Sequence, residues 1–266
     1  MKVLKRLVLA CLCIYLSLLA AIYGLQRKML YFPPQIYLAP QAVGLAGFEE
    51  IRIESSDRDT LTAWWAPPSS DSSKVVIFFH GNGSAVYSNY DIYRDIVQTG
   101  AGVLGVTYPG FPGSTGAPSQ KGIINAAAAH IEFLKEQKIT ADRFVYFGTS
   151  LGSAVAAQLT NLVPPSLLIM DASPNSIVDM GQKQMPFLLV SWLMKDQFRS
   201  DEALRGANVP MIWIHGTDDS IVPLDSGQKL FDGYDGPKAA HIIQRGQHTN
   251  LWGLGGREIV LQALKN

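Results

Sequence analysis

Hydrophobic residues are distributed in two different ways along the chain. From Leu7 to Leu25 there are 19 consecutive residues without a charge, which as a helix would measure about 28 Å, close to the thickness of a bilayer core. Beyond this run, apolar residues come in short stretches bounded by Gly, Pro, Asn, Asp and Ser. We therefore predict a membrane anchor over residues 1–28, a juxtamembrane connector over 29–47 and a globular domain over 48–266.

The N-terminal run favours an uncleaved transmembrane anchor over a cleaved signal peptide. It is longer than the apolar part of a usual signal peptide, and bulky Ile22 and Tyr23 follow Ala21, where a cleavage site needs small residues. Three basic side chains precede the run and two follow it. The positive-inside rule then predicts a single-pass protein whose globular domain lies on the outer, periplasmic or extracytoplasmic side.

The globular part alternates short apolar runs with helical stretches. This alternation predicts an α/β fold with a mostly parallel central sheet covered by helices on both faces. The first two strands are joined by a short turn and are expected to form an antiparallel edge. Strands are expected at 49–53, 60–65, 75–79, 102–107, 143–147, 167–170, 211–214 and 240–243, and helices near 91–99, 119–137, 153–159 and 225–232.

One segment, residues 173–207, departs from the alternation. Its centre, Met185 to Met194, is helical in character and rich in large apolar residues. With about 35 residues the segment is too short for a separate domain. It is expected to be either a crossover helix that faces the core or a small lid.

Charge and cysteine content narrow the possible functions of the body. Five of the 22 basic residues lie within residues 1–28, which hold no acid, so the remainder has 17 basic against 22 acidic residues. A net acidic body offers no basic surface for nucleic acid. Both cysteines, Cys11 and Cys13, lie in the apolar run, which excludes a disulfide framework or a cysteine-based zinc site in the body.

The segment Gly148-Thr149-Ser150-Leu151-Gly152 has the form G-x-S-x-G between a predicted strand and a predicted helix. Such a strand–turn–helix would expose the Ser150 hydroxyl above the sheet, with glycines where side chains would collide with neighbouring backbone. The alternative is an ordinary glycine-rich turn. Which applies depends on whether the rest of the chain supplies a base, an acid and an oxyanion site.

Ser150 would need an imidazole to take its proton and a carboxylate to orient that imidazole. His248 follows the last predicted strand, at the sheet edge that also carries Ser150, and is the predicted base; His80, which ends an earlier buried strand, is the alternative. The acid is expected after the strand at 211–214, where Asp218 and Asp219 are adjacent. The triad role is assigned to Asp219 and a turn-capping role to Asp218.

A tetrahedral intermediate also needs two N–H donors. The backbone amide of Leu151, directly after the nucleophile, is predicted to be one. The loop His80-Gly81-Asn82-Gly83-Ser84 follows a buried strand, and the amide of Asn82 is predicted to be the other. The alternatives are a loop without a catalytic part and a phosphate loop, although the segment matches neither phosphate-binding pattern.

Taken in order, these residues resemble the α/β-hydrolase superfamily and, more narrowly, the membrane-anchored Bem46-like serine hydrolases, which include the ABHD13 and ABHD17 relatives. In that family's H-G-x-x-D-x-x-V-P pattern the acid falls on Asp219. The resemblance covers nearly the whole chain. It is carried by Gln26-Arg27-Lys28-Met29-Leu30-Tyr31-Phe32-Pro33, Phe78-Phe79-His80-Gly81-Asn82-Gly83, Tyr108-Pro109-Gly110-Phe111-Pro112-Gly113-Ser114, Gly148-Thr149-Ser150-Leu151-Gly152, His215-Gly216-Thr217-Asp218-Asp219-Ser220-Ile221-Val222-Pro223 and Gly246-Gln247-His248.

The chain departs from the family pattern at two positions. Pro112 replaces the second glycine of Y-x-G-[FY]-G-x-S in a loop that is one residue longer, and this loop is expected to line the site and to alter the accepted substrate shape. Ser153 replaces a glycine after G-x-S-x-G, which should affect helix packing more than chemistry.

Residues and resemblance together predict a membrane-anchored serine hydrolase that cleaves an ester, thioester or amide through an acyl-enzyme on Ser150. The reaction requires no metal or cofactor. The expected partners are a small acyl substrate, lipid-like or acylated, and the membrane, which is bound through the N-terminal helix. Two alternatives stay open: a serine peptidase of the proline-aminopeptidase type, and a non-catalytic binding protein on the same fold.

Overall fold

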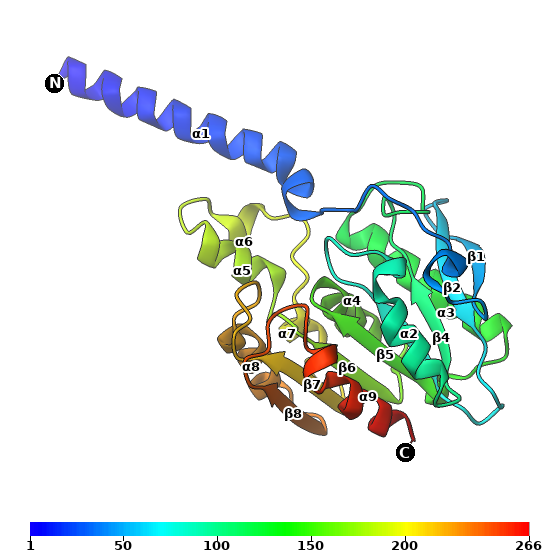
Figure 1. The fold of residues 1–266 in the computed structure, drawn as a ribbon. Coiled ribbons are helices and arrows are strands. Elements are labelled where there is room, and N and C mark those ends of the chain that lie inside the picture. Colours follow the sequence, from blue (N-terminus) through cyan, green and yellow to red (C-terminus); the bar gives the residue numbers. More distant parts are fainter. Residues whose placement is uncertain (266) are drawn as a thin grey trace.

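The computed structural model describes residues 1–265 as an α/β body from which one long helix projects (Figure 1). The strands are β1 (Glu49–Glu54), β2 (Thr60–Ala66), β3 (Val75–Phe79), β4 (Gly102–Val106), β5 (Phe144–Thr149), β6 (Leu167–Asp171), β7 (Met211–Gly216) and β8 (Lys238–Ile243). The α-helices are α1 (Lys2–Leu30), α2 (Tyr90–Val97), α3 (Gln120–Glu136), α4 (Leu151–Thr160), α5 (Ile177–Gln184), α6 (Val190–Leu193), α7 (Ser200–Ala203), α8 (Leu224–Gly233) and α9 (Gly256–Lys265).

Within residues 1–265 the strands form one eight-stranded sheet in the order β1-β2-β4-β3-β5-β6-β7-β8. The β1–β2 and β2–β4 pairs are antiparallel, and the other neighbouring pairs are parallel. The predicted fold, including its antiparallel edge, is confirmed. In the parallel part the carboxyl ends of the strands meet at one sheet edge, where sites form in such folds.

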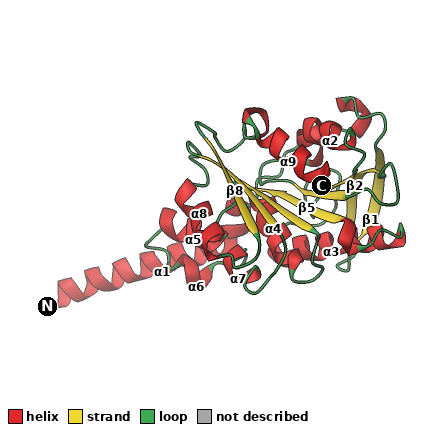
Figure 2. Ribbon diagram, turned by 90° about the horizontal axis from the view of Figure 1, so that it is seen from below, coloured by secondary structure: helices red, strands yellow, loops and turns green. Residues whose placement is uncertain are grey.

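Helices cover both faces of the sheet (Figure 2). Strand β3 explains why: all five of its residues are buried, and because side chains alternate along a strand they serve two separate cores. Val75, Ile77 and Phe79 pack in the core that includes residues of α3, α4 and α8. Val76 and Phe78 pack in the core that includes residues of α2 and α9.

The segment between β6 and β7 differs from the prediction in detail. A helix was expected within Met185 to Met194, but α5 ends at Gln184 and only Val190–Leu193 are helical. The physical reason is Pro186, which disfavours helical backbone at the residue before it. Met185 accordingly has φ −130° and ψ 64°. We call residues 177–195 the cap, because α5 and α6 lie beside the site described below.

Helix α1 is long and apolar enough to cross a membrane, with a mean hydropathy of 2.4 over its most apolar window. It continues to Leu30, two residues beyond the predicted end of the anchor. Its N-terminal half projects away from the body in both views (Figures 1 and 2). Its C-terminal end is held by the body, since Arg27 Nε donates to Asp196 Oδ2 over 2.8 Å.

Candidate active site

Ser150 occupies the sharp turn between β5 and α4. Its φ of 52° and ψ of −117° lie in a region that non-glycine residues rarely adopt, and such strain is concentrated at functional sites. The glycines on either side are sterically required, because a Cβ on Gly152 would collide with the carbonyl of Phe79 and one on Gly148 with the backbone of Gly152. The segment therefore has the geometry of a nucleophile elbow.

Asp219 and His248 form a hydrogen-bonded pair at the same edge of the sheet. His248 Nδ1 lies 2.8 Å from Asp219 Oδ2, and the Asp219 side chain is buried whereas that of His248 is 16 % exposed. A proton on Nδ1, shared with the carboxylate, leaves Nε2 free to accept a proton from a substrate-facing hydroxyl. Ser150 and His248 line the same cavity.

Asp219 also has the turn-capping role that was predicted for Asp218. Its Oδ1 accepts hydrogen bonds from the amides of Ile221 and Val222, each over 2.9 Å. Asp218 instead accepts a hydrogen bond from Thr217 Oγ1. Burial raises the pKa of Asp219, but the bonds from His248 and the two amides outweigh it, so the pKa lies below its ordinary value and the carboxylate is charged.

The other candidate base, His80, is fully buried at the end of β3. Its Nδ1 lies 2.9 Å from the carbonyl of Gly81, and burial lowers the pKa of His80 to about 4. Within the described residues its ring is absent from the cavity lining. A neutral histidine packed under the aromatic rings of Tyr108 and Phe111 is a core residue, which leaves His248 as the imidazole at the cavity.

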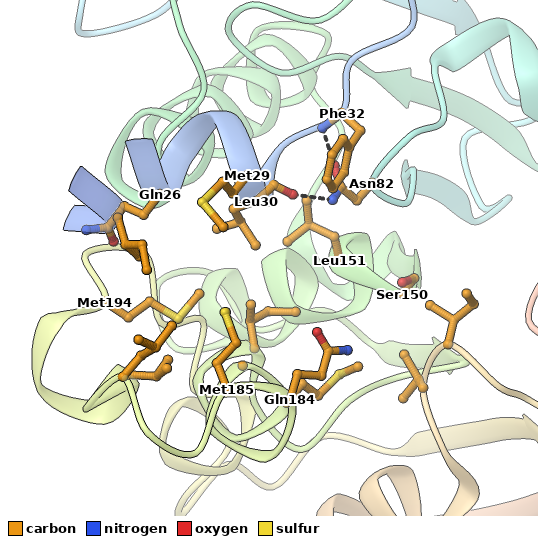
Figure 3. Close-up of a pocket in the computed structure, with 18 of the residues that line it drawn as sticks. Gln26, Met29, Leu30, Phe32, Asn82, Ser150, Leu151, Gln184, Met185 and Met194 are labelled. Atoms are coloured by element: carbon orange, nitrogen blue, oxygen red, sulfur yellow. Dashed lines mark hydrogen bonds between the residues drawn. The ribbon is translucent and has the colours of Figure 1, made fainter. Parts of the chain in front are cut away.

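The two predicted oxyanion residues, Asn82 and Leu151, both line the cavity (Figure 3). Leu151 is the first residue of α4, so its N–H belongs to the first turn, where amides have no partner within the helix. Within residues 1–265 neither backbone N–H donates a hydrogen bond. Both amides are thus available to a ligand.

The side chain of Asn82 has a role that the sequence did not indicate. Its Nδ2 donates to the carbonyl of Leu30 over 2.5 Å and its Oδ1 accepts from the amide of Phe32 over 3.0 Å (Figure 3). Leu30 is the last residue of α1, whose final carbonyls lack helical partners. The loop that would hold an oxyanion is therefore tied directly to the end of the long helix.

The cavity itself has a volume of about 570 Å³, within the range typical of small-molecule sites. One wall is the C-terminal half of α1 and another is the cap, whereas the sheet edge forms the floor (Figure 3). The two apolar walls carry four methionines, side chains that adapt to ligand shape. These are Met29, Met180, Met185 and Met194.

The two departures from the family pattern have structural roles. Ser153 is buried, and its hydroxyl donates to the carbonyl of Ser150 over 2.5 Å. It therefore stabilises the turn at Ser150 in addition to packing within α4. The loop from Tyr108 to Ser114 was expected to line the site. Instead none of its residues is among those that line the cavity in the described chain, because Phe111 turns inward onto His80.

Asp171, at the end of β6, is a neighbour of the site that the sequence analysis missed. Its backbone carbonyl accepts from the amide of Ser150 over 2.9 Å. Its Oδ1 is buried without a hydrogen-bond partner in the described part of the chain. Burial raises the pKa of Asp171 to about 7, with a smaller opposing effect of His248 and a further rise from Asp219. In the sequence, only the presence of an acidic residue at the end of the strand beside the elbow could have pointed to Asp171.

Comparisons with known proteins agree with this fold. Residues 74–189 match the family described as alpha/beta hydrolase fold. The alpha/beta hydrolase domain-containing protein WAV2 of Arabidopsis thaliana is 27% identical, over 89% of this chain and 85% of WAV2. The lysophosphatidylserine lipase ABHD12 of Danio rerio is 28% identical, over 64% of this chain but only 49% of ABHD12.

Among solved structures, the esterase Pf2001 of Pyrococcus furiosus superposes with a TM-score of 0.70 at 18% identity, over 88% of this chain and 97% of the esterase. At that identity the likeness concerns the fold. The narrower Bem46-like resemblance stays a prediction. The chain has the α/β-hydrolase fold, and its residues 74–189 match the model of that fold family.

Proposed function

We propose that the chain is a serine hydrolase that cleaves an ester or thioester with an apolar acyl group. The observation that carries the proposal is the meeting of three features at one apolar cavity: the strained elbow at Ser150, the buried Asp219–His248 pair and two free backbone amides. A binding protein on the same fold would have no need of a strained serine beside an oriented imidazole.

In the proposed reaction, Ser150 Oγ attacks the acyl carbonyl carbon while His248 Nε2 takes the hydroxyl proton. The carbonyl oxygen becomes an oxyanion that accepts hydrogen bonds from the amides of Asn82 and Leu151. The tetrahedral intermediate collapses, the bond to the leaving oxygen or sulfur breaks, and His248 returns the proton to the leaving group. Water then attacks the acyl-enzyme by the same route, releasing the acid and Ser150. Asp219 holds the imidazole and stabilises its transient positive charge.

The lining of the cavity supports the proposal that the part of the substrate bound there is an apolar acyl chain. Its methionine-rich walls can adapt to a chain without fixing its length, and the amide of Gln184 lies among them (Figure 3). Few polar groups face the interior of the cavity. In ligand sites such polar groups set the orientation of the ligand. A charged peptide substrate, as in the peptidase alternative, has no specific support from these residues.

Hydrolysis of p-nitrophenyl esters of increasing chain length by the full-length chain in detergent tests the proposal. We expect activity that rises with acyl length and disappears in Ser150→Ala. Ser153→Ala, which removes a neighbouring hydroxyl in the same elbow, should retain activity within about tenfold. Equal hydrolysis by Ser150→Ala and wild type would exclude the proposed nucleophile.

We also propose that the body faces the outer side of the membrane. Of the two basic residues that follow the apolar run, Arg27 is paired with the buried carboxylate of Asp196, which leaves Lys28 against three basic residues before the run. The imbalance favours a cytoplasmic N-terminus. A reporter fused after Asn266 should be active outside the cytoplasm, and a reporter active only inside would reverse the orientation.

A further inference from the structure

Helix α1 is covered along one side only, and only in its C-terminal half. Residues 2–14 are all exposed. From there on a single stripe is half-buried, at helical spacing that keeps its members on one face. These residues are Tyr15, Leu19, Ile22, Gln26 and Leu30.

The stripe faces the cap from Tyr15 to Gln26, whereas the carbonyl of Leu30 is bound by Asn82. At one end, Gln26 Nε2 donates to the carbonyl of Leu193, and Tyr23 lies under the ammonium group of Lys195 at 4.0 Å. At the other end, the hydroxyl of Tyr15 donates to the carbonyl of Phe187 over 2.7 Å. The cap therefore reaches along α1 as far as Tyr15.

The length of α1 then determines how deep the cap lies in the membrane. The uncovered part of α1, residues 2–14, spans about 20 Å, which is shorter than a hydrocarbon core of about 30 Å. If α1 crosses the membrane, its apolar run to Leu25 must lie in the core. Along the helix axis Tyr15 lies about 15 Å from Leu25, which corresponds to a depth of about 11 Å along the membrane normal for a helix tilted by 40°. The part of the cap that contacts Tyr15 is at the same depth.

The chemistry of this part of the cap suits a lipid environment. We define the cap tip as residues 185–194, an uncharged run between Lys183 and Lys195. Three of its large apolar side chains are exposed: Phe187 is 82%, Leu189 51% and Trp192 87% exposed. Basic residues beside an aromatic apolar surface are typical of segments that bind the membrane interface.

Most carbonyls of the cap tip have hydrogen-bond partners, whereas the amides of Phe187, Leu189 and Val190 have none within the described chain. In hydrocarbon, a carbonyl without a partner costs several kcal/mol. Eight of the ten carbonyls in the tip accept hydrogen bonds within the described chain, several of them from the side chains of Tyr15, Gln26, Gln182 and Gln197.

We propose that the cap tip is immersed in the lipid leaflet beside α1 and that the acyl chain enters the cavity from the lipid phase. Immersion rests on α1 crossing the membrane, and substrate entry rests on the proposed function. Because α1 and the cap are the two walls of the cavity, the gap between them opens into the leaflet. The substrate class is then an amphiphilic ester or thioester resident in that leaflet.

Fluorescence quenching tests immersion without reference to activity. Trp64, Trp65 and Trp213 are buried and Trp252 is half-buried, so Trp192 is the exposed indole. We expect nanodiscs of phosphatidylcholine brominated along the acyl chains to quench the full-length wild type and to leave Trp192→Phe largely unquenched. Equal fractional quenching of both proteins would overturn the immersion.

A variant with Phe187→Ser, Leu189→Ser and Trp192→Ser tests substrate entry. Its hydrolysis of a water-soluble short ester in detergent should stay within about twofold of wild type, and its hydrolysis of a long-chain ester in nanodiscs should fall by about tenfold or more, equivalent to about 1.4 kcal/mol. Leu162→Ser is the matched control, because Leu162 is 61% exposed before β6, at the opposite sheet edge. It should hydrolyse both esters normally.

The outcomes separate the two proposals. Equal loss on the soluble and the embedded ester would show that the tip acts through the fold, and the entry route would be wrong. Wild-type protein that hydrolyses neither ester would refute the proposed function, and the quenching measurement would still decide whether the tip is immersed.

Discussion

The sheet edge and the cap side of the cavity are built from different kinds of structure. At the edge, β3 and the start of α4 are buried, and Gly152 has no room for a methyl group. On the cap side, Phe187 and Trp192 are exposed, and the contacts join residues far apart in the chain, such as Tyr15 and Phe187. In the proposed function, a rigid scaffold would therefore position the catalytic groups, whereas the acyl chain would bind to a surface completed by α1 and, in our proposal, by lipid.

The largest difference between the two sides is expected for the catalytic pair. His248→Ala and Asp219→Asn should each lower kcat by about 10⁴-fold, because the base or its orientation is lost. On the cap side, Gln184→Ala should raise KM with little change in kcat. Steady-state kinetics on a soluble ester provide both values. Activity that survives Asp219→Asn but is lost in Asp218→Asn would show that Asp218, and not Asp219, is the acid.

A glycine-to-alanine substitution should lower the free energy of unfolding much more at the sheet edge than in the cap. Gly152→Ala forces a Cβ into the carbonyl of Phe79 and should destabilise the fold by about 3 kcal/mol or more. Gly181→Ala in α5 places its Cβ 3.1 Å from Val190 Cγ1, which a small shift relieves, and alanine favours helix. We expect a lowered Tm for Gly152→Ala and a nearly unchanged Tm for Gly181→Ala. Equal losses would mean that the cap is packed as rigidly as the elbow.

A pH effect is expected from Asp171 on the rigid side. Its pKa is raised from 3.8 to about 7, so the fold prefers the neutral acid and loses stability as the pH rises from about 4 to about 7. Asp171→Asn cannot ionise, and we expect it to be more stable than wild type at pH 8 by about 4 kcal/mol and nearly equal to it at pH 4. Thermal unfolding at several pH values checks this. Parallel pH profiles for the two proteins would contradict it.

The smallest predicted effect concerns the residue that joins the two regions. Asn82→Ala keeps the backbone N–H but removes both bonds to the end of α1, each worth about 1 kcal/mol. We expect kcat to fall about tenfold for short and long esters alike. Ser84→Ala in the same loop should have no effect. An unchanged Asn82→Ala enzyme would show that the oxyanion loop is independent of the helix.

The scaffold was predictable from the sequence because its signals are local. The buried run at 75–79 and the G-x-S-x-G turn specify β3 and the elbow through side-chain alternation and backbone sterics. The order of Ser150, Asp219 and His248 then followed from strand ends at one edge. Even here the roles of neighbours were misassigned, since Asp219 and not Asp218 accepts the turn amides.

What the sequence did not reveal depends on tertiary contacts. Nothing near Asn82 indicates that its side chain caps a helix 52 residues earlier. The buried carboxyl of Asp171 becomes unusual only through its surroundings. Apolar residues at 185–194 were visible, but whether they face the core, the site or the membrane depends on how α1 lies beside them, and no periodicity within the segment contains that information.

The most direct test of the account is the location of covalent labelling by a fluorophosphonate on the full-length protein. The account predicts one phosphonyl group per chain, found by mass spectrometry on Ser150, and no labelling of Ser150→Ala. A preparation that hydrolyses esters yet carries the label on another residue, or no label at all, would contradict the assignment of Ser150 as the nucleophile.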